Sequence, residues 1–134
     1  IALYVSGLKS GINVPGKAFA NSGSLKEQKI KTYNERLAEM KYIHHCAACH
    51  GNDGKGDGFN AINLDQVPPD FTDAEYMNLL THEYLVKAIS EGGQVINKSP
   101  LMPSWKNTLT PDDVERLATF VSDFGDKPKE DDTN

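Results

Sequence analysis

The chain has 134 residues, the length of a single domain with one modest core. Its composition, 38% hydrophobic and 25% charged, excludes wholesale disorder and a fibrous repeat, and no apolar run reaches the about 18 residues of a membrane span. Acidic side chains outnumber basic ones by 19 to 14, which disfavours a nucleic-acid binder, since such proteins present a basic face. Residues 1–50 carry a net charge of +4 and residues 51–134 one of −9. This asymmetry indicates either a solvated acidic surface or a bipolar molecule that electrostatics can orient toward a partner.

The first 23 residues differ in character from the rest. A short apolar start is followed by a polar, glycine-containing stretch, and Ala18–Phe19–Ala20 has the pattern of a cleavage site. The segment before it is too polar for the apolar region of a signal peptide. We therefore expect residues 1–23 to be a retained N-terminal extension, residues 24–125 to form the domain, and residues 126–134 to be an acidic C-terminal tail.

The first predicted helix begins at a capping box, Ser24–Leu25–Lys26–Glu27, and continues into the cysteine motif. Apolar residues recur along it at spacings of three and four, which defines one helical face. That face comprises Ile30, Tyr33, Leu37, Met40 and His44. We expect Met40 to fill the core, as we do Met77 further along the chain.

A glycine-rich segment, residues 51–58, interrupts regular structure and predicts a loop whose backbone visits positive φ or lies close to other atoms. Asp73–Leu80 predicts a short helix. Thr81 predicts the cap of another helix that ends before Gly92–Gly93, and residues 94–109 show no regular period.

The last predicted helix has the strongest start signals: Thr110 as N-cap, Pro111 at the first position and acidic residues in the first turn. Its apolar residues run from Val114 to Phe124, and Gly125 is the candidate C-cap. The sequence predicts an all-α fold of four to five short helices with long loops. Short helices of this kind bury little apolar surface by themselves, so we expect an apolar group to fill the centre of the domain.

Cys46–Ala47–Ala48–Cys49–His50 is a C-x-x-C-H sequence, the pattern of covalent haem c attachment. Two thiols on one helical turn can reach the two vinyl groups of one porphyrin, and the adjacent His50 can then bind the iron from the same side. Three other interpretations compete. A redox C-x-x-C needs a βαβ context that the sequence does not show. A zinc site could draw on His44 and His45 with the motif, but lacks the usual second pair of ligands downstream. The third interpretation is that the C-x-x-C-H pattern occurs here by chance.

Met102 is the candidate for the opposite axial position, because a thioether paired with histidine is typical of a high-potential electron-transfer haem. Met102 lies in a loop between Pro100 and Pro103. The alternative is a buried loop methionine without a ligand role. His82 is the rival sixth ligand, whereas His44 and His45 are expected at the surface or at the haem edge.

On these segments the chain resembles the class I cytochrome c family over residues 25–124. The matching segments are C-A-A-C-H-G with N-D-G-K-G-D-G after it, Pro68–Pro69–Asp70–Phe71, Ile89–Gly93, Leu101–Met102–Pro103 and the capped last helix. The resemblance implies the class I fold, in which the first and last helices cross near the haem. Here the crossing would involve Ala38, Tyr42, Leu117 and Phe120. It also implies a hydrogen bond from Trp105 to a haem propionate, with simple packing under the loop as the alternative. The family often has a proline whose carbonyl holds the proximal histidine. Here that place is Phe59, whose carbonyl can take the same role.

The function that this resemblance implies is a monohaem electron carrier, not an enzyme, with one haem c bound through Cys46 and Cys49. His50 and Met102 would be its axial ligands. The implied partners are other redox proteins that dock near the exposed haem edge, and the implied compartment is a periplasm or its equivalent. Two alternatives stay open: a cytochrome subunit of a larger oxidoreductase, and a haem module with an open or bis-histidine sixth site.

Overall fold

The computed structural model describes residues 22–126, so the expectations for residues 1–21 and 127–134 lie outside it. The chain divides into two units, residues 1–32 and 33–134, and the described part of the first unit is the beginning of helix α2. The helices are α2 (Ser22–His45), α3 (Ala47–His50), α4 (Ala74–Met77), α5 (His82–Glu91) and α6 (Pro111–Ser122). Three short 3₁₀ helices lie between and after them: η1 (Ala61–Asn63), η2 (Gly93–Ile96) and η3 (Asp123–Asp126). Within residues 22–126 there is no strand, which confirms the all-α prediction.

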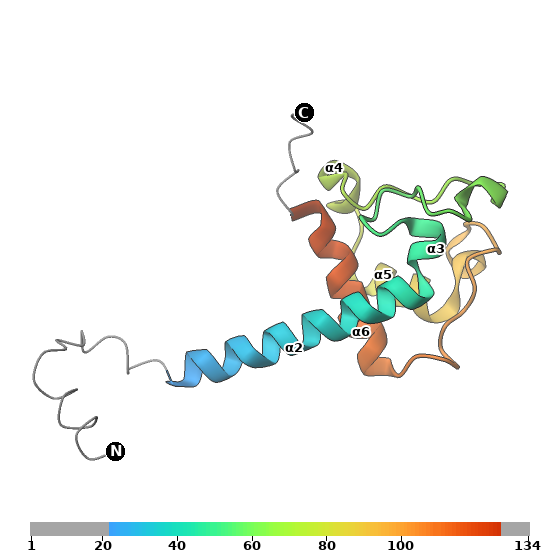
Figure 1. Ribbon diagram of the computed structural model, residues 1–134. Coiled ribbons are helices and arrows are strands. Elements are labelled where there is room, and N and C mark those ends of the chain that lie inside the picture. The colour runs from blue at the N-terminus through green and yellow to red at the C-terminus, as the bar shows by residue number, and fades with distance from the viewer. Residues whose placement is uncertain (1–21, 127–134) are drawn as a thin grey trace, which may run out of the picture. The chain divides into compact units, whose positions relative to one another are not determined.

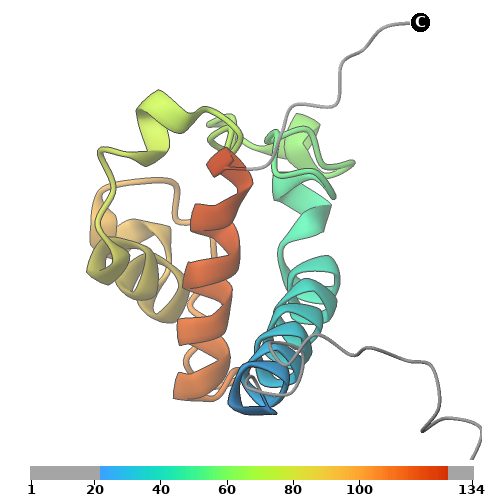
Figure 2. The ribbon, with the colours of Figure 1, turned by 90° about the vertical axis from the view of Figure 1, so that its left-hand side faces the viewer.

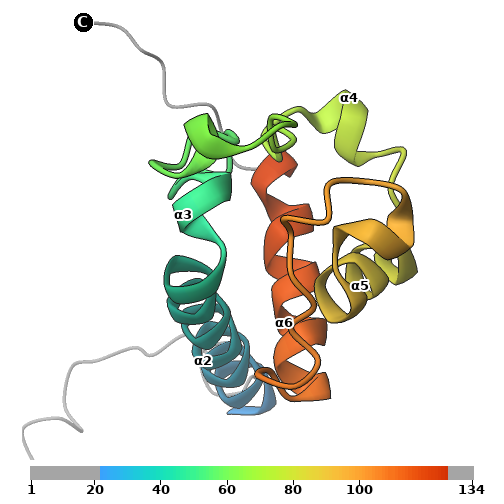
Figure 3. The same ribbon diagram turned by 90° about the vertical axis from the view of Figure 1, so that its right-hand side faces the viewer.

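Helix α6 lies in the centre of the second unit, with the C-terminal half of α2 on one side and α5 on the other (Figures 2 and 3). The α2–α6 contact is made by Tyr42, whose ring lies 5.3 Å from that of Phe120, and by Asn34, which accepts a hydrogen bond from Arg116. Tyr42 is 1% exposed and Leu117 is fully buried. The helix crossing implied by the resemblance is therefore present.

The start of the first helix and its buried face differ from the prediction. α2 begins at Ser22, so Ser24 lies inside the helix and not ahead of it. Met40 is 54% exposed, and Ile30 and Tyr33 are exposed as well, so most of the predicted apolar face points to solvent. The helix buries the narrower face of Ala38 and Tyr42 instead, which is the face that packs toward α6. Met77, by contrast, is 7% exposed and belongs to the core, as expected.

The later helices follow their local signals closely. Thr110 accepts a hydrogen bond from the backbone N–H of Asp113, and Asp113 accepts one in return from that of Thr110, a complete capping box. Thr81 and Asp73 cap α5 and α4 by a single hydrogen bond each, which their side chains accept from the backbone N–H groups of Tyr84 and Tyr76. The end of α6 was predicted wrongly: Asp123 is its C-cap, and the chain continues through Gly125 in a 3₁₀ turn.

No helix among residues 22–126 is both long and apolar enough to cross a membrane. Figure 1 shows α3 and the loop that follows it, residues 51–72, at the same end of the second unit as α4. This end carries one wall of the candidate site.

Candidate haem site

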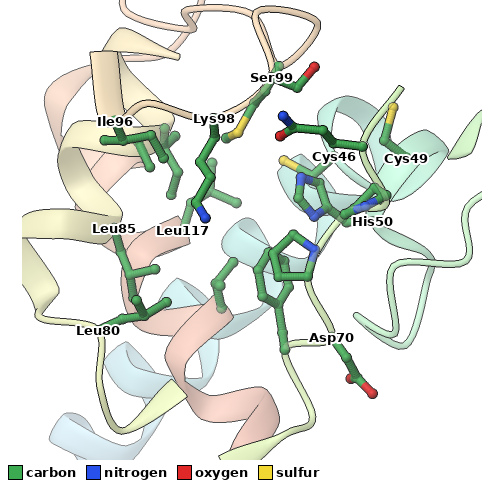
Figure 4. Close-up of a pocket in the computed structure, with 18 of the residues that line it drawn as sticks. Cys46, Cys49, His50, Asp70, Leu80, Leu85, Ile96, Lys98, Ser99 and Leu117 are labelled. Carbon is green, nitrogen blue, oxygen red and sulfur yellow. The ribbon is translucent and has the colours of Figure 1, made fainter. Parts of the chain in front are cut away.

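The C-x-x-C-H motif forms a single helical turn after a break. α2 ends at His45, Cys46 is a turn residue, and α3 carries the other four residues of the motif. The backbone N–H of Cys46 still donates to the carbonyl of Tyr42 at 2.8 Å, and that of His50 donates to the carbonyl of Cys46 at 2.9 Å. The helical path is thus nearly continuous, and it places Cys46, Cys49 and His50 on the wall of one cavity (Figure 4).

This cavity has a volume of about 400 Å³ and an apolar lining. Pockets that hold drug-sized ligands have volumes of about 300–1,000 Å³, and this cavity falls within that range. α5, α6 and the loop of residues 96–105 form the wall that faces the motif (Figure 4). All five residues singled out in the sequence line it: Cys46, Cys49, His50, Met102 and Trp105.

The His50 ring is buried and stacks on Phe71, with ring centroids 4.8 Å apart. Burial lowers its pKa to about 4, so the imidazole is neutral at pH 7 and keeps a lone pair for a metal. Its Nδ1 atom is buried without a hydrogen-bond partner among the described residues. The bond to the Phe59 carbonyl that the sequence allowed is therefore absent, and the Phe59 side chain is 86% exposed. A neutral histidine on the cavity wall fits an iron centre bound there.

The glycine-rich loop holds this wall in place. Gly54 has φ +74°, and a Cβ atom there would lie 3.1 Å from the Phe124 ring. Its carbonyl accepts a hydrogen bond from the backbone N–H of Phe71 at 2.7 Å, which brings Phe71 beneath His50. At Gly58 a Cβ atom would lie 2.2 Å from the Ala48 carbonyl oxygen, so the loop can pass so close to α3 only as glycine. The expectation of positive φ and close approach in this segment is confirmed.

The two thiols are free and occupy different surroundings. Burial raises the pKa of Cys46 to about 12, and the charge of Cys49 adds to that effect. Cys49 Sγ lies 3.7 Å from Asn60 Nδ2, which donates a hydrogen bond to it. The sequence gave no sign of this contact, because Asn60 reaches the motif only through the fold of the loop.

Met102 lies on the facing wall, and the backbone of Gly92–Gly93 anchors it. The N–H of Gly93 donates to the Met102 carbonyl at 3.0 Å, and a Cβ atom at Gly92, where φ is +87°, would lie 2.9 Å from the same oxygen. The backbone N–H of Trp105 donates to the Ile89 carbonyl at 3.2 Å, and the centroid of its ring lies 5.0 Å from that of His45. The glycine pair, predicted only as a helix stop, therefore also determines where the Met102 loop lies.

The structure does not bring together the two competing ligand sets, His82 as the sixth haem ligand and the residues of a zinc site. His82 Nε2 lies 2.6 Å from Glu115 Oε2 on the surface, and His82 is absent from the cavity lining. Across residues 22–126, no group of three or more histidine, cysteine, aspartate or glutamate side chains is arranged to hold a metal ion, which argues against the zinc interpretation. Of the ligand sets considered, the one whose residues line a single cavity among the described residues is Cys46, Cys49, His50 and Met102.

Three comparisons with known proteins agree on one group. A family model described as "Cytochrome C oxidase, cbb3-type, subunit III" matches residues 34–121. The chain is 28% identical over 95 residues to the cbb3-type cytochrome c oxidase subunit FixP of Bradyrhizobium diazoefficiens, covering 71% of this chain and 29% of the relative. It is 26% identical over 125 residues to subunit FixPc of Rhizobium leguminosarum bv. viciae, covering 93% and 34%. The chain thus spans about a third of the length of these relatives.

A solved structure, titled KustC0563 c-type cytochrome, superposes with a TM-score of 0.53 and 31% sequence identity. The match covers 65% of this chain and 95% of that one.

Proposed function

Because the chain belongs to the family of cbb3-type cytochrome c oxidase subunit III, we propose that its second unit is a one-electron carrier whose haem is held by Cys46, Cys49, His50 and Met102. The family assigns the protein to the c-type cytochromes, which carry covalently bound haem c. When bound, haem c supplies a one-electron iron couple. The rest of the function depends on what this chain's residues do around it.

The observation that carries the proposal is the pairing of two walls across one apolar cavity. On one wall Cys46 and Cys49 would form the two thioethers, and the neutral His50 would bind the iron. On the other wall Met102 would bind from the opposite side, a pairing that favours the reduced iron. The apolar lining excludes water, which stabilises the less charged reduced state and limits structural change on electron transfer.

His50 and Met102 would together hold the iron and leave no position on it for a substrate, so we propose a carrier and not an enzyme. Trp105 lines the cavity and would donate its indole N–H to a haem propionate. The partners would be redox proteins that dock near the haem edge. The compartment would lie outside the cytoplasm, since haem c is attached after export in this family.

A second candidate function is a subunit role in a larger oxidoreductase, which the subunit names of the relatives favour. The two candidates differ in assembly and not in the chemistry of the site. Size-exclusion chromatography of the protein from its native extract distinguishes them, because a carrier elutes at its own mass and a subunit elutes with its complex.

Absorption spectra of oxidised protein test the axial ligands. The wild type should show the far-red charge-transfer band of a thioether bound to ferric iron, and Met102→Ala should lose it and lower the reduction potential. Met40→Ala is the matched control, because Met40 is an exposed methionine of α2. His82→Ala should leave the spectrum intact.

Absence of the band from wild type, or its loss in His82→Ala, would contradict the assignment of Met102. Rapid binding of CO by the reduced wild type at neutral pH would instead indicate an open sixth position. Mass spectrometry of the denatured chain tests attachment separately: one haem should remain bound, and its extraction into acidified organic solvent would refute the thioethers at Cys46 and Cys49.

A further inference from the structure

Lys98 extends from the Met102 loop into the haem cavity (Figure 4). Its backbone is fixed on both sides. Asn97 adopts the left-handed conformation, with φ 57° and ψ 37°, at the end of η2, and the N–H of Lys98 donates to the Gly93 carbonyl at 2.8 Å. The Ser99 hydroxyl lies 3.1 Å from Asp65 Oδ1. The backbone at Lys98 thus belongs to a turn that its neighbours hold in place.

Lys98 is the only lysine or arginine among the residues that line this cavity. Its ammonium makes no hydrogen bond or ion pair with any residue in the range 22–126. Lys98 lines the cavity but is exposed to solvent, and an ammonium in this place gains stability from an anion bound beside it. The wall of the cavity therefore presents one cation for which the described chain supplies no anion.

The other ionisable groups on the lining have partners or are neutral. Asp70 accepts hydrogen bonds from the backbone N–H and the hydroxyl of Thr72, and Asp73 caps α4 through the N–H of Tyr76. His45 packs its ring on Trp105, and Tyr76 and Tyr84 are phenols. Lys98 is the one lysine or arginine on the lining, so its ammonium is the group there that can pair with an added carboxylate.

We propose that Lys98 binds a propionate carboxylate of the haem and so positions the prosthetic group and raises its potential. The inference rests on the proposed function, because it needs haem in this cavity. Haem brings two carboxylates into an otherwise apolar space, and Lys98 supplies the charge that one of them needs. Trp105 would act differently, as a neutral donor that leaves the charge of the carboxylate uncompensated.

Two measurable properties follow. A cation near the iron stabilises the reduced state, so removing it lowers the reduction potential. It also lowers the pKa of the propionic acid, so its removal moves that titration to higher pH. For a pair open to solvent, the expected change is about two- to fivefold in the equilibrium constant against a reference couple.

The experiment compares haem-loaded Lys98→Gln and Lys98→Arg with Lys87→Gln, a control that removes the same charge from the exposed face of α5. Potentials are measured from pH 5 to 8, and the carboxylates are titrated by infrared difference spectroscopy. Lys98→Gln should lower the potential and raise the propionate pKa, Lys98→Arg should restore both, and Lys87→Gln should change neither. The far-red band should persist in all three.

Equal shifts in Lys98→Gln and Lys87→Gln would overturn the proposal, because they would reflect net charge alone. Loss of the far-red band in Lys98→Gln without recovery in Lys98→Arg would also overturn it, by assigning Lys98 to the folding of the loop. A wild-type chain that retains no covalent haem would refute the proposed function itself, an outcome separate from both of these.

Discussion

Removal of the Tyr42 hydroxyl should destabilise the protein at neutral pH and stabilise it at high pH. This hydroxyl is buried and donates a hydrogen bond to the Gly51 carbonyl at 2.8 Å, which ties α2 to the residue after His50. The same carbonyl also accepts from the N–H of Gly54 at 3.2 Å, so it keeps one partner in Tyr42→Phe. The loss at pH 7 should therefore be that of one hydrogen bond, about 1 kcal/mol, and not that of an unsatisfied buried group.

The sign reverses because burial raises the pKa of Tyr42, with the carboxylates of Asp53 and Asp57 adding to the effect. Above pH of about 10 the phenol ionises in the unfolded chain but stays protonated in the folded one. Unfolding then releases a proton, so this single group lowers the free energy of unfolding by about 1.4 kcal/mol per pH unit. Tyr42→Phe lacks this contribution, and the two stability curves should cross near pH of about 11.

Urea denaturation followed by circular dichroism between pH 7 and 11 measures both effects. Tyr33→Phe is the control for loss of an exposed hydroxyl at neutral pH, since Tyr33 points to solvent. A difference between wild type and Tyr42→Phe that stays constant from pH 7 to 11 would refute the argument from burial. No difference at pH 7 would refute the role of the hydrogen bond.

Three further changes test the packing. Leu117→Ala should lower the free energy of unfolding by about 2–5 kcal/mol in urea denaturation, because the side chain is fully buried between helices; a loss below 1 kcal/mol would show that the core collapses around it. Gly54→Ala should cost about 1–3 kcal/mol by the same assay, since a Cβ atom meets the Phe124 ring at positive φ, and wild-type stability would contradict that geometry. Burial opposes ionisation of Asp113, but its hydrogen bonds to Lys41 and to the helix cap outweigh burial and lower its pKa. The ionised carboxylate therefore stabilises the fold at pH values above the ordinary pKa of aspartate, and this contribution is lost as the pH falls through the lowered pKa. Asp113→Asn should therefore be less stable than wild type at pH 7 but nearly equal at pH 2, and an equal difference at both values would contradict the ion pair.

The parts of the fold that the sequence predicted well depend on local chemistry. Thr110 and Pro111 specify the start of α6 within one turn, and the C-x-x-C-H spacing defines a site on a single turn of helix. Hydrophobic periodicity failed on α2, where the larger apolar side chains lie outside and the small Ala38 lies inside. Periodicity measures how apolar a face is, whereas the helix crossing selects the face that lets two backbones approach.

The candidate site shows the same division. The motif was visible in the sequence because its residues are adjacent, and Met102 was singled out by its prolines. The contacts of Asn60 with Cys49 and of His82 with Glu115 join residues that are 11 and 33 positions apart. No local sequence pattern predicts such contacts. Lys98 likewise reaches the cavity lining after a left-handed turn at Asn97, and asparagine is too common in ordinary loops to predict such a turn.

The protonated state of Cys46 has a consequence for the order in which the protein matures. A thiol whose pKa is about 12 is almost entirely un-ionised at neutral pH, and the thiolate is the reactive form. A chain that had already closed its helices around the cavity would present a poor nucleophile to the porphyrin. Burial of Cys46 therefore favours thioether formation on a chain that is still open and whose thiols are solvated. On that order, the core would assemble around a prosthetic group already attached to the polypeptide.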